Sequence, residues 1–158
     1  MTYHISFKLA LNNIIHDTLF MARKKIFNIT VYETKNFEVN QDWECPITGF
    51  FIIASKHKLC SFIDLSDEEA QELMQVIMTV RKAMKQVLHV DHVYFFQEES
   101  NQFPFHVWIL PHYPWMDSIA TGPEAVAAIW EHATKQMNDN RHKKQVDIAA
   151  EKVKQFLK

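Results

Sequence analysis

The pattern of apolar and polar positions predicts a sheet in the first two thirds of the chain. Ile26–Glu33 alternates and is rich in β-branched and aromatic residues, so it predicts a strand, with a short second strand at Phe37–Val39. Gly49–Ser55 is a continuous apolar run of strand length, which is typical of a buried central strand. The remaining strands are expected at Val93–Gln97 and Phe103–Leu110, where the short polar link between them favours an antiparallel hairpin.

Helical spacing dominates elsewhere. Asp67–Leu88 is the clearest helix, because Ser66 and Glu69 form a capping box and apolar residues then recur every three or four positions. A second helix is expected to open at Gly122-Pro123-Glu124, with Asn138–Asn140 ending it. A last helix is expected from about Lys143 to the end of the chain. For Asp17–Lys25 the spacing is less regular, and a helix or a helical turn is expected.

Together these elements predict an α+β fold, with an antiparallel sheet, one long covering helix and a helical C-terminal extension at about 117–158. With 158 residues and no linker, a single domain over 1–158 is expected. The net charge of −2 does not favour nucleic acid as a partner. No apolar run is long enough to span a membrane, and the first residues do not resemble a signal peptide. The two cysteines, Cys45 and Cys60, fit reduced thiols, so a cytoplasmic protein is expected.

The stretch Asn101–Trp115, NQFPFHVWILPHYPW, concentrates aromatic residues, histidine and proline. As a strand it places mostly apolar side chains on both faces, which predicts that both faces are covered. His106 is the exception, because a buried imidazole needs partners for its ring nitrogens. On chemistry alone, a core histidine with satisfied hydrogen bonds is the more frequent interpretation, and a catalytic histidine is the alternative.

Over residues 26–113 the chain resembles the histidine triad (HIT) family of nucleotide hydrolases and transferases. One segment of that family has a glycine, an apolar strand, the motif P-K-x-H and then the acidic start of a helix. It is similar to Pro46–Glu69 of this chain, PITGFFIIASKHKLCSFIDLSDEE. PFHVWILPHY, Pro104–Tyr113, resembles its signature H-x-H-x-H-x-x-P-R, with Pro111 at the final proline. That register puts the three signature positions at Pro104, His106 and Trp108, so the signature is degenerate.

The resemblance implies that His106, the middle signature histidine, is the catalytic nucleophile and forms a nucleotidyl-imidazole intermediate. It also implies substrate-binding positions at Asp42, which would bind the ribose hydroxyls, at His57, which ends the P-K-x-H segment, and at Gln97, Trp108 and His112. Trp108 replaces the third histidine and His112 replaces the usual arginine.

The expected function is therefore hydrolysis or nucleotidyl transfer on a nucleoside phosphate derivative, such as a dinucleoside polyphosphate or a nucleoside phosphoramidate. The alternative is a catalytically weak or inactive HIT-like module that binds nucleotide, because Pro104, Trp108 and His112 depart from the pattern.

The resemblance also implies a homodimer. No cofactor is expected, and no metal: zinc held by His57, His106 and His112 is conceivable, but no ligand spacing requires it. Tyr113-Pro114-Trp115 forms a lid over the site or, as we prefer, a packing anchor for the C-terminal helices.

Overall fold

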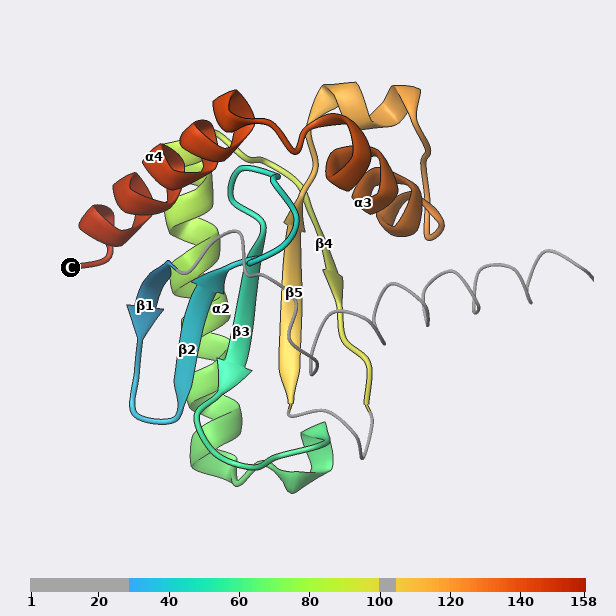
Figure 1. Cartoon of the computed structure of the whole chain (residues 1–158). Helices are drawn as coiled ribbons and strands as arrows, with labels where there is room; N and C mark the ends of the chain where they lie inside the picture. The colour runs from blue at the N-terminus through green and yellow to red at the C-terminus, as the bar shows by residue number, and fades with distance from the viewer. Residues whose placement is uncertain (1–28, 100–104) are drawn as a thin grey trace, which may run out of the picture.

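The structure, a computed structural model, describes residues 29–99 and 105–158. Five antiparallel strands form one sheet in the order β1-β2-β3-β5-β4 (Figure 1). The predicted α+β class, with an antiparallel sheet and a long covering helix, is confirmed. The strands are β1 (Thr30–Glu33), β2 (Phe37–Gln41), β3 (Phe51–Ser55), β4 (Val93–Phe96) and β5 (His106–Pro111).

The strand that carries His106 lies inside the sheet. β5 pairs with β3 on one side and with β4 on the other, so Ala54 is opposite His106, and Ile52 and Phe96 are both opposite Trp108. All six residues of β5 are buried. The expectation of a strand covered on both faces is therefore confirmed.

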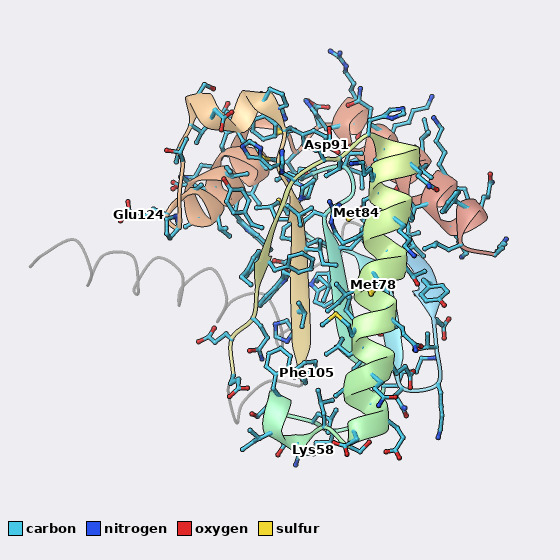
Figure 2. All side chains as sticks on the ribbon, turned by 180° about the vertical axis from the view of Figure 1, so that it is seen from behind. Lys58, Met78, Met84, Asp91, Phe105 and Glu124 are labelled. Atoms are coloured by element: carbon cyan, nitrogen blue, oxygen red, sulfur yellow. The ribbon has the colours of Figure 1, made fainter. Side chains whose placement is uncertain are left out.

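One face of the sheet is covered by the long helix α2 (Asp67–Leu88), which lies in front of the sheet in Figure 2. Ser66 caps it as predicted: its side chain accepts a hydrogen bond from the Glu69 backbone N–H, and the Glu69 carboxylate accepts one from the Ser66 N–H. Burying one apolar stripe of this helix contributes about 1.5–3 kcal/mol per large side chain. Its core-facing residues are Leu73, Val76, Val80, Ala83 and Met84.

The two C-terminal helices separate onto opposite faces of the sheet. α4 (Asn140–Phe156) joins the layer of α2, where Ala150 and Val153 share a core with α2 and β1. α3 (Ala125–Gln136) instead packs on the other face, together with the short 3₁₀ helix η2 (Pro114–Ser118). Both η2 and α3 lie at the end of the sheet where β5 ends, away from His106 (Figure 1).

Several boundaries differ from the predicted ones for local reasons. β3 begins at Phe51, because Gly49 adopts a positive φ of 73° in a turn. α4 begins at Asn140, because the Asp139 side chain caps it. α3 begins at Ala125, later than the Gly122-Pro123-Glu124 opening. A further 3₁₀ helix, η1 (Phe62–Asp64), was not anticipated. The helix expected at 17–25, the start of the first strand at 26–28 and Phe103–Pro104 lie outside the described residues.

Candidate functional site

His106 stands at the first position of β5, on the sheet face that points away from α2. Trp108 and Leu110, two and four residues further along β5, point to the same face, which they share with Ile52 of β3. The imidazole is 3% exposed, and its ring centroid is 4.0 Å from the indole of Trp108 in an edge-to-face contact. The register therefore brings His106 and Trp108, two of the residues expected in the site, into direct contact.

Trp108 also stacks on Phe96 of the neighbouring strand, with ring centroids 4.9 Å apart and an interplanar angle of 16°. Phe50 continues this aromatic row toward α3, because its ring contacts both Phe96 and Trp130. Within the described part of the chain, the buried Trp108 Nε1 has no hydrogen-bond partner. Such a group carries a desolvation cost, typically about 1–3 kcal/mol, which packing of the indole must offset.

A polar row borders the same face on β2. Thr30 donates a hydrogen bond to the Asn40 side chain at 2.7 Å, and Asn40 donates one to the Glu38 carboxylate at 3.1 Å. Glu38 is opposite Ala54, which is opposite His106, so Glu38 and His106 are two strands apart, or about 10 Å. The sequence reasoning missed these polar residues, although their alternation with the buried Phe37, Val39 and Gln41 was the available signal.

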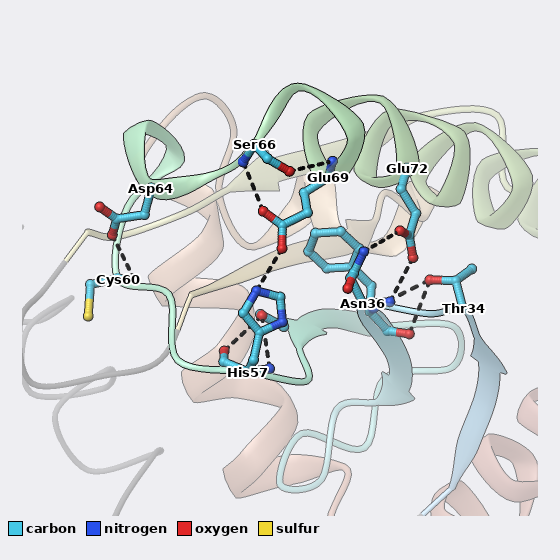
Figure 3. Close-up of polar contacts among 10 residues, drawn as sticks. Thr34, Asn36, His57, Cys60, Asp64, Ser66, Glu69 and Glu72 are labelled. Carbon is cyan, nitrogen blue, oxygen red and sulfur yellow. Dashed lines mark hydrogen bonds and ion pairs between the residues drawn. The ribbon is translucent and has the colours of Figure 1, made fainter.

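His57 lies in the loop after β3, at the end of the sheet where β5 starts. Its Nε2 is 2.7 Å from the Glu69 carboxylate on α2, and its side chain is 43% exposed (Figure 3). Glu69 is also the capping residue of α2, so His57 ties the loop to the start of that helix. This contact directs the imidazole toward the helix layer rather than toward the face of His106.

Gln97 directly follows β4. Because Phe96 is opposite Trp108, Gln97 lies beside Val107 of β5. Its side chain donates a hydrogen bond to the Glu98 carbonyl at 3.1 Å and lines a groove between α2 and β4. The groove lies on the face opposite that of His106. Gln97 is therefore near His106 along the strands but separated from it by the thickness of the sheet.

Asp42 lies at the end of the sheet where β3 begins and β5 ends, far from His106. Its backbone N–H donates a hydrogen bond to the Phe50 carbonyl, and the next residue, Phe51, is opposite Ile109 of β5. Its Oδ1 accepts hydrogen bonds from the backbone N–H groups of Glu44 and Cys45 at 3.0 and 2.7 Å. The side chain is fully buried, and this burial raises the pKa of Asp42 to about 7. The geometry assigns Asp42 to fixing the β2–β3 loop, and the ribose contact that the resemblance implied for it finds no support in this position.

His112 is likewise distant, since six residues of extended chain separate it from His106 by about 20 Å. Its Nε2 is 2.8 Å from the Asp117 carboxylate in η2, and its ring packs against Tyr94. In the same segment the buried Met116 anchors η2 against α3. Among residues 29–99 and 105–158, no three side chains of histidine, cysteine, aspartate or glutamate form a group that could hold a metal ion.

Comparison with known proteins supports the fold. No family model and no curated protein matches the sequence. The structure is similar to a hypothetical histidine triad nucleotide-binding protein of Sulfolobus tokodaii, with a TM-score of 0.55 and 16% identity over 94% of this chain and 93% of that one. It is also similar to the Plasmodium falciparum diadenosine triphosphate hydrolase, with a TM-score of 0.51 and 14% identity over 95% of each chain.

A third similar structure is the Caenorhabditis elegans NitFhit protein, with a TM-score of 0.51 and 20% identity over 74% of this chain. The chain spans only 29% of the length of that protein. These likenesses establish that the chain has the HIT-like α+β fold. No helix in the described ranges combines the length and the apolar character needed to cross a membrane.

Proposed function

We propose that this protein is a HIT-like hydrolase or nucleotidyl transferase that acts on a dinucleoside polyphosphate or a nucleoside phosphoramidate. The observation that carries the proposal is the imidazole of His106, on the sheet face opposite the long helix of a HIT-like fold. A similar fold belongs to a diadenosine triphosphate hydrolase, which supports a phosphate derivative as substrate. The chemistry is assigned to His106, because the other two signature positions hold Pro104 and Trp108, whose side chains cannot act as the nucleophile.

In this proposal a ring nitrogen of His106 attacks the α-phosphorus in line. A P–N bond forms, the bond to the leaving phosphate or amine breaks, and the leaving group takes up a proton. Water then attacks the same phosphorus, which releases the nucleotide and restores the imidazole. Trp108 has one N–H donor and no charge, so it contributes an aromatic wall rather than a charged donor to the phosphoryl oxygens. Loss of one such donor costs about 10²- to 10³-fold in rate, so slow turnover is expected.

The polar row at Glu38 and Asn40 is proposed to contact the sugar hydroxyls, since a carboxylate accepts hydrogen bonds from both of them. This assignment replaces Asp42, which lies at the other end of the strands. Glu38 and Asn40 are half-buried, so their polar groups remain accessible to a ligand from the His106 face.

A nucleotide-binding module without turnover is the competing function. It is favoured by Trp108, whose indole is stacked into the sheet by Phe96 where a third catalytic histidine would stand. Calorimetry with AMP, run beside a turnover assay with diadenosine triphosphate and adenosine phosphoramidate, separates the two. Binding with turnover supports the enzyme, binding without turnover supports the module, and the absence of both contradicts both.

The nucleophile is tested with His106→Ala, with His92→Ala at an exposed position as the matched control. We expect wild type and His92→Ala, but not His106→Ala, to form an adduct with the mass of AMP, found on His106 by mass spectrometry under alkaline conditions. If His106 is only a core histidine, the adduct is absent from wild type and His106→Ala instead loses stability, by about 1–3 kcal/mol.

We further propose a homodimer, formed through the groove of about 430 Å³ between α2 and β4. Its surroundings expose large apolar side chains: Phe62, Met74, Met78 and Phe95. β4 is also an edge strand of the described sheet, so a second copy can pair with it and cover the groove.

Met74→Lys is expected to reduce the mass measured by light scattering from two chains to one. Ile148→Lys, at a similarly exposed position on α4, is expected to leave that mass unchanged. A wild-type mass of one chain contradicts the proposal.

A further inference from the structure

A second cavity, of about 540 Å³, opens at the end of the sheet where β5 ends. Three parts of the chain build it: the β2–β3 loop, the segment around η2, and α3 with the first turns of α4, which gather at this end in Figure 1. Its volume lies in the range of small-molecule sites, about 300–1,000 Å³. The lining includes Thr48, Trp115, His132, Met137, His142 and Gln145.

The walls of this cavity are held in place by specific contacts. The Tyr113 hydroxyl donates a hydrogen bond to the Thr48 carbonyl at 2.9 Å, which joins the start of η2 to the β2–β3 loop. The Trp115 carbonyl accepts a hydrogen bond from the Ser118 hydroxyl, which fixes the backbone of η2. The Trp115 and His132 rings lie 5.7 Å apart at 37°, so two planar groups from different elements border the space. Such a preformed wall lowers the ordering cost of binding a ligand.

The polar side chains of the lining can each donate a hydrogen bond to a ligand. Within the described part of the chain, the side chains of Thr48, His132 and Gln145 make no hydrogen bond, so their donors are unused. His142 is directed differently, because its Nδ1 lies 2.7 Å from the Asp139 carboxylate and only its Nε2 is left for a ligand. No aspartate or glutamate belongs to the lining. The cavity therefore matches a molecule that offers hydrogen-bond acceptors and no positive charge.

We propose that this cavity binds a small planar aromatic carboxylate. The aromatic ring would lie against Trp115 and the flexible side chain of Met137, since one offers a flat face and the other an adaptable apolar surface. The carboxylate would accept hydrogen bonds from His132 and Gln145, which stand on α3 and α4. Tyr113 and His106 are seven residues apart, about 23 Å in an extended chain, so this site and the His106 site can be filled together.

The test uses the full chain and 2-naphthoate as the probe, with binding measured by calorimetry. We expect saturable binding of one probe per chain, with a dissociation constant below about 1 mM. Gln145→Ala is expected to weaken binding about tenfold, because a hydrogen bond to a charged group is lost. His132→Ala is expected to have a similar effect. Gln155→Ala, on the same helix, and His92→Ala, both at exposed positions, are the matched controls and should bind as the wild type does.

Two further measurements separate this site from the His106 site. Saturating AMP should leave the affinity for 2-naphthoate unchanged, and so should His106→Ala. The cation 2-naphthylmethylamine should not bind, because no carboxylate lines the cavity. The proposal is overturned if 2-naphthoate fails to bind, if binding survives both Gln145→Ala and His132→Ala, or if AMP competes for it. Failure of the proposed enzymatic function would leave all of these outcomes as stated.

Discussion

Replacement of Asp42 by asparagine tests the consequence of burying a carboxyl group without a cation beside it. The Asp42 side chain is 0% exposed, and burial raises its pKa from 3.8 to about 7. Within the described residues Oδ2 has no hydrogen-bond partner, whereas Oδ1 accepts from two backbone N–H groups. An asparagine oxygen can accept the same two bonds, so Asp42→Asn removes the ionisation and keeps the contacts of the loop.

The direction of the effect follows from the raised pKa. Between pH 4 and 7 the folded state keeps a proton that the unfolded state has released, so stability falls as pH rises through this window and is level above it. A shift of about 3 units corresponds to about 4 kcal/mol, at about 1.4 kcal/mol per unit. This value is an upper bound, because relaxation of the loop lets water reach an ionised carboxylate.

Urea unfolding of both proteins at pH 5 and pH 8 measures the effect. The other titrating groups contribute equally to both proteins and cancel in the difference between the two pH-dependences. We expect the wild type to lose about 2–3 kcal/mol more than Asp42→Asn between these pH values, because the change occurs between pH 5 and about 7, at about 1.4 kcal/mol per pH unit. Asp42→Ala is the control for the hydrogen bonds, and it should be less stable than Asp42→Asn at both pH values, by about 1–3 kcal/mol. Equal pH-dependence in wild type and Asp42→Asn would refute the reasoning.

Three other predictions concern turnover and the turns and caps of the fold. Trp108→His restores the third histidine of the HIT pattern and should raise turnover if the indole limits phosphate handling; a loss of turnover in a kinetic assay would show that Trp108 shapes the substrate pocket. Gly49→Ala should destabilise by more than Gly122→Ala in thermal unfolding, because both glycines have positive φ but only at Gly49 would a Cβ come within 2.6 Å of Leu88. Ser66→Ala should cost about 0.5–2 kcal/mol in urea unfolding through loss of the cap of α2, and an unchanged midpoint would contradict this role.

The sequence by itself determined the local elements of this protein. Ser66 and Glu69 set the start of α2, because capping uses only neighbouring residues. The alternation around His106 and Trp108 placed both side chains on one face of a strand buried on both sides. The register of Pro111 within a HIT-like pattern indicated the fold, and the sheet of the structure confirmed it.

Only the tertiary structure decided which distant residues meet. Asp42 and His112 could be aligned with a sequence pattern, but the β2–β3 pairing and the length of β5 place both at the end of the sheet opposite His106. α3 and α4 show similar apolar stripes, yet one covers the face of Trp108 and the other lies beside α2. Periodicity reports which side of an element is apolar, whereas the partner of that side depends on strand order and on packing between residues far apart in the chain.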